Sequence, residues 1–251
     1  MTTPVLSTRD LTVRYGGVVA NDQVCLQVDP GQIVGLIGPN GAGKTSFIDA
    51  VSGFTGCTGE IELAGTAFGS LPAHRRARLG LARTWQSIEL FRDLSVYENA
   101  LVAAHRFSIR RLLADLVRPG REEADSHVWA ALDLVGLRDL AHRRTEELSL
   151  GQRKLLGVAR ALAARPKILL LDEPAAGLDV EESKELGDRL RDVVAEGISV
   201  LLVDHDMGLV LEVCDQVYVL EFGKVIAHGE PNRVRTDPAV IAAYLGSGAD
   251  T

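Results

Sequence analysis

The sequence predicts an α/β fold with a parallel core sheet, into which a mostly helical segment is inserted. Three continuous apolar runs have the length and composition of fully buried strands, at residues 33–37, 168–171 and 198–203. A polar stretch with helical spacing, residues 180–196, separates the last two runs. Because strands that alternate with helices are typical of βαβ units, we expect these strands to lie parallel in one sheet.

The N-terminal third supplies further strands and the first helix. Apolar and polar side chains alternate at residues 24–28, the pattern of a strand with one buried face. A glycine-rich turn follows the buried strand, and residues 45–52 are then expected to form a helix. Residues 59–64 alternate again, and residues 81–85 are one more candidate strand.

The middle of the chain changes to a helical pattern. Ser95 and Glu98 have the spacing of a capping box, which predicts a helix that begins at Val96. Apolar residues then recur at helical spacing over residues 122–135 and are followed by a glycine. We therefore expect residues 86–144 to be a mostly helical insert.

The C-terminal part predicts a hairpin and a last helix. Two extended segments, residues 216–221 and 224–227, flank Gly223. Further on, Pro238 in a first turn and Gly246 beyond the end are typical helix boundaries.

Composition and charge exclude several classes of protein. The 251 residues carry a formal net charge of −7, whereas non-specific nucleic-acid binding usually needs a basic surface. No apolar run approaches the ~20 residues that span a bilayer, and the N-terminus lacks the pattern of a secretory signal. Cys25, Cys57 and Cys214 are odd in number and far apart, which fits neither a disulfide framework nor a metal knuckle. The composition therefore predicts a chain of the reducing cytoplasm that does not itself span a membrane.

The strongest local motif lies between the buried strand at residues 33–37 and the helix that follows it. Residues 38–45 fit the pattern G-x-x-x-x-G-K-[ST] at every fixed position. Glycines let backbone N–H groups turn toward a phosphate, and the N-terminus of the helix adds positive potential. Lys44 is expected to reach the β- and γ-phosphates, and the Thr45 hydroxyl is expected to bind Mg²⁺. The predicted nucleotide contacts in this segment are Gly38, Pro39, Asn40, Gly41, Ala42, Gly43, Lys44, Thr45 and Ser46.

A pair of acids follows the buried strand at residues 168–171. Asp172 stands where a carboxylate at the end of a parallel strand can hold Mg²⁺ through water. Glu173 lies one residue further, where a hydrolytic water could sit. Spacing alone also allows a solvated role for Glu173, so its assignment depends on the motifs around it.

A third motif identifies a family. Residues 148–152 read Leu-Ser-Leu-Gly-Gln and directly precede a helical run. Together with the phosphate loop and the acidic pair, they resemble the ATP-binding-cassette (ABC) ATPases, whose signature is Leu-Ser-Gly-Gly-Gln. The motif order along essentially the whole chain is also that of the family: Tyr15, the phosphate loop, Gln86, the signature, the acidic pair, Asp179 and His205.

The resemblance implies a fold and a division of the chain. The fold is that of a P-loop NTPase of the ABC type, with a mixed or parallel core sheet, an N-terminal antiparallel β subdomain and an inserted α-helical subdomain. The whole chain, residues 1–251, forms one domain. Residues of about 1–85 and 165–230 form the catalytic core with the β subdomain, about 86–164 the helical subdomain, and about 231–251 a C-terminal helix.

The resemblance also implies roles for single residues. Tyr15 would stack on adenine, an interaction for which an aromatic face is suited. Mg²⁺ would be bound by Thr45, Gln86 and Asp172, and Gln86 would also contact the attacking water.

The resemblance assigns the chemical step to two further residues. Glu173 would activate the attacking water, and His205 would contact the γ-phosphate and orient Glu173. The residues expected to act across an interface between two ATPase subunits are Ser149, Gly151, Gln152 and Asp179.

One position departs from the family signature. Leu150 stands where the consensus has glycine. Its side chain could crowd the ATP of the opposite subunit or alter the contact between the two subunits. The departure therefore leaves open whether both ATP sites of a homodimer would be equally active. Asp204 and Ser46 are expected to be tolerated variations of the family pattern.

Several segments resemble one branch of the family more closely. The ATPase subunits of bacterial uptake systems for branched-chain and other hydrophobic amino acids resemble this chain at residues 83–86, 90–99, 174–178, 205–207, 227–229 and 244–246. The helical insert around residues 106–123 resembles the larger of the two ATPase subunits that those systems pair. The resemblance implies a position on the cytoplasmic face of the bacterial membrane. The implied partners are two membrane-spanning subunits, whose short helices would lie in a groove near Gln86, and a second ABC ATPase subunit that is identical or related. An extracytoplasmic binding protein would be an indirect partner.

Two other readings stay open. One is the ATPase of a lipid, lipopolysaccharide or drug exporter, which resembles this chain in length and in its C-terminal segment. The other is an ABC ATPase that acts on DNA or ribosomes. We expect no nucleic-acid partner, because the chain has one phosphate loop, no sustained heptad pattern and a net charge of −7.

Overall fold

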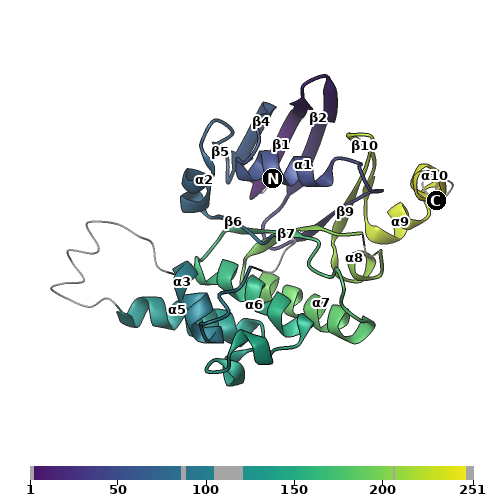
Figure 1. The fold of residues 1–251 in the computed structure, drawn as a ribbon. Coiled ribbons are helices and arrows are strands. Elements are labelled where there is room, and N and C mark those ends of the chain that lie inside the picture. The colour runs from purple at the N-terminus through teal and green to yellow at the C-terminus, as the bar shows by residue number, and fades with distance from the viewer. Residues whose placement is uncertain (1–2, 86–88, 105–120, 206, 247–251) are drawn as a thin grey trace.

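The computed structural model describes residues 3–85, 89–104, 121–205 and 207–246. The described residues form two β-sheets and a set of helices around them (Figure 1). None of the helices in these ranges is long and apolar enough to cross a membrane.

The N-terminal sheet is antiparallel. Its four strands have the order β2-β1-β4-β5, and they are β1 (Leu6–Tyr15), β2 (Val18–Val28), β4 (Thr58–Leu63) and β5 (Thr66–Ala67). As the alternating pattern predicts, Val24, Leu26 and Val28 are all buried, on one face of β2. This sheet confirms the antiparallel β subdomain that the family resemblance implies.

The central sheet is mixed. Its order is β10-β9-β3-β8-β7-β6, and its strands are β3 (Ile33–Ile37), β6 (Leu81–Arg83), β7 (Ile168–Asp172), β8 (Ser199–Val203), β9 (Gln216–Glu221) and β10 (Lys224–Gly229). The pairings β9–β3, β3–β8, β8–β7 and β7–β6 are parallel, and only β10 runs antiparallel, as the second strand of the predicted hairpin. Because the strands are parallel, the segments that follow β3, β7 and β8 leave the sheet at the same edge.

Helices cover both faces of the central sheet. In Figure 1, α1 and α2 lie with the N-terminal sheet on one side, and α3, α5, α6 and α7 lie on the other. The helices are α1 (Lys44–Ser52), α2 (Ala73–Leu79), α3 (Val96–Ala104), α5 (Arg121–Leu134), α6 (Leu150–Ala163), α7 (Val180–Ala195), α8 (Met207–Val213), α9 (Pro231–Arg235) and α10 (Pro238–Gly246), with 3₁₀ turns at Arg138–Leu140 and Thr145–Glu147.

The core forms two clusters that share the central sheet. Successive residues of its buried strands alternate between them: in β7, Leu169 and Leu171 belong to the cluster under α5, α6 and α7, whereas Ile168 and Leu170 belong to the cluster under α1 and the N-terminal sheet. Since both faces of β7 are covered, the strand is apolar throughout until it ends at Asp172.

The sequence located most of the long elements. The capping box is present, since Ser95 Oγ accepts from Glu98 N at 3.2 Å and Ser95 N donates to Glu98 Oε2 at 2.8 Å, and α3 begins at Val96. The strand expected at residues 81–85 is shorter and ends at Arg83. Helices α2 and α8 were not anticipated.

The C-terminal segment also differs in detail from the expectation of one helix. It forms two short helices, α9 and α10, and Gly246 lies in α10 and not beyond it. The chain leaves α9 at Thr236, and Asp237 precedes the proline that opens α10. Since proline has no N–H to donate, a helix boundary at Pro238 is natural.

Candidate nucleotide-binding site

The phosphate loop connects the end of β3 to the start of α1, and two of its positions require glycine. Gly38 has φ 151° and Gly43 has φ 104°, which side chains rarely tolerate. A Cβ atom would lie 2.1 Å from the Leu220 carbonyl oxygen at Gly38, and 2.3 Å from the Ala20 carbonyl oxygen at Gly43. The loop is therefore clamped between β9 and β2.

Asn21 on β2 fixes the end of this loop. Its side chain is fully buried, and its Nδ2 donates to the Gly43 carbonyl oxygen at 3.1 Å. No pattern in the sequence predicts this contact, because Asn21 is an isolated polar residue in a strand. Tyr15 lies at the end of the neighbouring strand β1 with 48% of its surface exposed, so its ring is accessible for the predicted stacking.

Lys44 is buried at the first position of α1. Its Nζ donates to the carbonyl oxygens of Gly38 at 2.6 Å and Pro39 at 3.0 Å. Burial lowers the pKa of Lys44, and the carboxylates of Glu173, Asp204 and Asp172 oppose that shift. The ammonium group of the loop thus lies close to the acids at the ends of β7 and β8. Thr45 and Ser46 follow in the first turn of α1, with Thr45 exposed.

The two predicted acids have different environments. Asp172 is the last residue of β7 and is buried, and its Oδ2 accepts from Arg83 Nη2 at 2.9 Å. Glu173 has φ 48°, a left-handed conformation uncommon for a residue with a side chain, and its N–H donates to the Val203 carbonyl oxygen at 2.7 Å. Strain of this kind clusters at functional sites, where the surrounding structure holds it in place.

His205 follows β8 and lies beside Glu173 and Asp204. Its Nδ1 lies 3.8 Å from Glu173 Oε2 and 3.7 Å from Asp204 Oδ1, and the ring is more than half exposed. Asp204 is fully buried and accepts from the N–H groups of Ala175 at 3.1 Å and of His205 at 2.8 Å. Asp204, which the sequence suggested was a tolerated variation, therefore joins the end of β8 to the turn after Glu173.

The signature residues lie at the N-terminus of α6, on the other side of the central sheet from α1 (Figure 1). Ser149 caps α6: its Oγ accepts from Gln152 N at 3.2 Å, and its N–H donates to Gln152 Oε1 at 3.0 Å. The capping alternative for Ser149 is thus present in the structure, and it leaves the Oγ proton free to point elsewhere.

An acid that the sequence did not single out accepts a hydrogen bond from this hydroxyl group. Glu182 Oε1, in the first turn of α7, accepts from Ser149 Oγ at 3.1 Å and from Gly151 N at 3.2 Å. These donors are the ones that the family resemblance assigns to a γ-phosphate. The two groups come together only through the packing of α6 against α7, so no local pattern could reveal the pair.

Leu150 and Asp179 are also placed by this packing. A Cβ on Gly177 would lie 3.3 Å from Leu150 Cδ2. The leucine side chain therefore packs against the loop that leads to Asp179. Asp179 is the N-cap of α7, and its Oδ1 accepts from Glu182 N at 2.8 Å. Gln86, predicted to contact Mg²⁺ and water, lies outside the described residues.

The loop that follows β3 lies close to the carboxylates at the ends of β7 and β8, and His205 lies beside two of them. Comparisons with known proteins show the family. Residues 21–176 match the model of the family described as "ABC transporter", and residues 224–250 match that described as "Branched-chain amino acid ATP-binding cassette transporter". The chain belongs to the ABC transporter family, as an ATP-binding subunit with ATPase activity.

Individual relatives are similar over nearly their full length. The chain is 41% identical to the high-affinity branched-chain amino acid transport ATP-binding protein BraF of Pseudomonas aeruginosa, over 98% of this chain and 99% of that protein. It is 40% identical, with the same coverage, to the corresponding LivG of Escherichia coli K12. Among solved structures, the ADP conformation of MJ1267, an ATP-binding cassette of an ABC transporter, has a TM-score of 0.85 at 29% identity, covering 98% of this chain and all of that one.

Proposed function

We propose that this chain powers the import of branched-chain or other hydrophobic amino acids, as an ATP-hydrolysing subunit on the cytoplasmic face of a bacterial membrane. The observation that carries the proposal is the similarity to BraF and LivG over nearly the full length of the chain, together with the C-terminal match over residues 224–250. The substrate would be selected outside the cell by a binding protein and passed to the membrane-spanning subunits, so this chain need not contact it.

ATP would bind with its adenine on Tyr15 and its phosphates in the loop of residues 38–45. The side chains near the loop suit Mg²⁺, because this ion prefers oxygen ligands and the Thr45 hydroxyl and the Asp172 carboxylate both supply them. Arg83 engages Oδ2 of Asp172, so Oδ1 is the oxygen we expect to face the ion or its water. When bound, Mg²⁺ neutralises charge on the phosphates.

Hydrolysis would depend on a proton acceptor next to the loop. We assign this role to Glu173, which would take a proton from the attacking water while Lys44 stabilises charge on the γ-phosphate. The 3.8 Å separation between His205 Nδ1 and Glu173 Oε2 supports a role for His205 in orienting that carboxylate. Lys154 Nζ donates to the Glu173 carbonyl oxygen at 3.2 Å, which ties α6 to the same turn.

A second cassette would complete the site. Ser149, Gly151 and Gln152 would bind the γ-phosphate held by the opposite subunit, with the N-terminus of α6 directed at that charge. Asp179 would lie at the interface between the two. For this contact to form, the carboxylate of Glu182 must give up its bonds to Ser149 Oγ and Gly151 N.

Glu182→Ala is therefore expected to favour ATP-driven association of the two cassettes. Each of the two hydrogen bonds contributes ~0.5–1.5 kcal/mol, so the ATP concentration for half-maximal association should fall by about fivefold to 150-fold. Light scattering on a hydrolysis-deficient background would measure it. Glu181→Ala, an exposed acid in the same turn, is the matched control and should leave association unchanged. An unchanged or higher ATP requirement in Glu182→Ala would contradict the displacement of Glu182.

The membrane-spanning subunits would dock in a groove of about 1190 Å³ between α2, the end of β6 and α6. Apolar and aromatic side chains line much of it, including Phe54, Trp85, Leu90 and Phe91. A short amphipathic helix from a membrane subunit fits such a surface, since its apolar side chains can insert between the rings.

A second candidate function is supported by one relative. The chain is 37% identical to the lipopolysaccharide export system ATP-binding protein LptB of Escherichia coli K12, over 96% of this chain and 97% of that protein. An exporter partner would leave the ATP site assignments unchanged and alter only the cargo.

Identifying the membrane partners distinguishes the two functions. The tagged chain would be captured from membranes solubilised in mild detergent, and the co-purifying proteins identified. Two membrane-spanning subunits with a second, shorter cassette are expected, and radiolabelled leucine uptake should then be lost in a Lys44→Ala strain. A single exporter-like membrane partner would overturn amino-acid import. Ribosomes or DNA-repair proteins without a membrane subunit would overturn transport altogether.

A further inference from the structure

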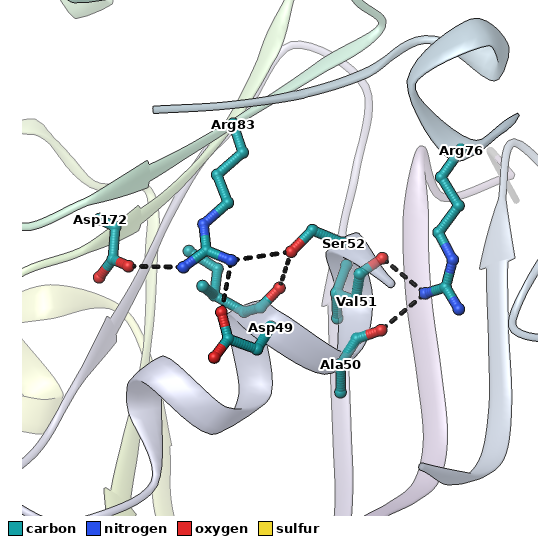
Figure 2. Close-up of polar contacts among 8 residues, drawn as sticks. Asp49, Ala50, Val51, Ser52, Arg76, Arg83 and Asp172 are labelled. Carbon is teal, nitrogen blue, oxygen red and sulfur yellow. Dashed lines mark hydrogen bonds and ion pairs between the residues drawn. The ribbon is translucent and has the colours of Figure 1, made fainter. Parts of the chain in front are cut away.

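Arg83, the last residue of β6, lies between the phosphate-loop helix and the end of β7 (Figure 2). Its Nη1 donates to Asp49 Oδ1 at 2.6 Å and to Ser52 Oγ at 3.0 Å, both on α1. Its Nη2 donates to Asp172 Oδ2 at 2.9 Å. One guanidinium group therefore bridges the helix that follows the phosphate loop and the carboxylate proposed to serve the metal.

The ion pairs of Arg83 with Asp172 and Asp49 are largely shielded from water. The side chains of Arg83 and Asp172 are 5% and 6% exposed, and that of Asp49 is 26% exposed. A buried ion pair must recover the cost of removing its charges from water, which requires good geometry on every partner. The planar fork of arginine can hold two carboxylates at fixed positions at once, whereas the single ammonium group of lysine cannot reproduce that geometry.

The same guanidinium group also faces the groove. Its Cζ lies 4.3 Å from the centre of the Trp85 ring and 5.9 Å from that of Phe54, and the two rings meet edge to face at 4.8 Å. Arg83, Trp85 and Phe54 all line the groove proposed for the membrane subunit. Arg83 is therefore in direct contact with both the aromatic wall of the groove and Asp172.

We propose that Arg83 is a positioning residue that fixes the carboxylate of Asp172 and couples it to the Phe54–Trp85 wall of the groove. A helix that displaces these rings would move the guanidinium group and so change how well Asp172 serves Mg²⁺. By linkage, Mg²⁺ bound with ATP would in turn alter the surroundings of Trp85. This inference rests on the proposed function, both for the role of Asp172 and for the occupant of the groove.

The chain offers a matched control in Arg76, a second buried arginine at the same helix (Figure 2). Its Nη1 donates to the carbonyl oxygens of Ala50 at 2.6 Å and Val51 at 2.8 Å, and its Nε to that of Leu71 at 2.7 Å. Replacing Arg76 also removes side-chain contacts with the C-terminal end of α1, but these bonds do not involve Asp49 or Asp172.

The experiment uses Trp85 as a reporter. The chain has two tryptophans, so Trp129→Phe leaves Trp85 as the only one. The Trp129→Phe protein is the parent for all other variants. When Mg²⁺ is titrated into the ATP complex of this parent, the fluorescence emission of Trp85 should change. Calorimetry measures nucleotide binding independently. Arg83→Lys keeps the charge and removes the fork. It should reduce the emission change at least about fivefold and raise the Mg²⁺ concentration for half-saturation by a similar factor, the lower range of site-to-site coupling.

Arg76→Lys should retain the parent's emission change and Mg²⁺ requirement. A reciprocal variant, Trp85→Ala, alters an exposed ring and should also raise the Mg²⁺ requirement about fivefold. Because this variant lacks the reporter, calorimetry with Mg²⁺ and ATP measures its Mg²⁺ requirement, which keeps the test valid if Arg83→Lys folds poorly. Normal Mg²⁺ requirements in both Arg83→Lys and Trp85→Ala would overturn the coupling while the proposed function stands. A parent that binds no Mg²⁺-ATP by calorimetry would overturn the proposed function itself.

Discussion

Glu173→Gln is expected to bind ATP and to hydrolyse it about 10²–10⁴-fold more slowly than the unmodified chain, because a positioned general base typically contributes that factor. Glutamine has nearly the same shape as glutamate but does not accept a proton from water. The bond from Glu173 N to Val203 O and the backbone turn do not depend on the carboxylate, so the fold should persist. Phosphate release measures the rate, and calorimetry measures ATP binding.

The same variant should accumulate the closed dimer, because ATP remains at the interface. Glu196→Gln removes an exposed carboxylate at the end of α7 and serves as the control, with hydrolysis expected at the unmodified rate. Hydrolysis at the unmodified rate in Glu173→Gln would show that another group accepts the proton.

Lys44→Ala should lose most of the affinity for ATP. The ammonium group lies within hydrogen-bonding distance of the loop carbonyls at Gly38 and Pro39, where it can turn to the phosphates. Hydrogen bonds to charged groups contribute ~1.5–3 kcal/mol each, so losing one or more should weaken binding by about 10- to 100-fold or more. Calorimetry with ATP measures the change.

Lys184→Ala is the matched control, because Lys184 is an exposed lysine on α7. It should leave ATP affinity unchanged. Thermal unfolding of Lys44→Ala would establish that the loop still folds. If Lys44→Ala bound ATP as tightly as the unmodified chain, the loop could not be the phosphate site that its sequence predicts.

Local patterns in the sequence predicted the elements whose environment repeats regularly. The runs at β3, β7 and β8 are apolar without interruption because both faces of the central sheet are covered, by α1 and the N-terminal sheet on one side and α5, α6 and α7 on the other. Helix α3 was predicted to its first residue because its capping box is local chemistry. Helix α2 was missed because its sequence, AHRRARL, has little apolar periodicity, and its main anchor, Arg76, binds distant carbonyl groups.

The phosphate loop, the acid pair and the signature could be identified from sequence because each is a contiguous motif whose residue types follow from its chemistry. Glycine at positions 38 and 43 is required by backbone conformation and by close approach of Leu220 O and Ala20 O. Those requirements are imposed by distant strands, but they leave a local mark in the sequence.

Only the tertiary structure decided the contacts between motifs. Asn21 with Gly43, Arg83 with Asp172, and Glu182 with Ser149 each join residues between 22 and 89 positions apart. A lone asparagine, arginine or glutamate carries no periodicity and no motif, so the sequence gives no reason to prefer one partner over another. The sequence alone determined the class of chemistry, because nucleotide binding needs particular residue types at fixed spacing. The packing of β6 beside β7 and of α6 beside α7 determined which buried charges and donors surround those residues, because such partners are chosen by proximity in space.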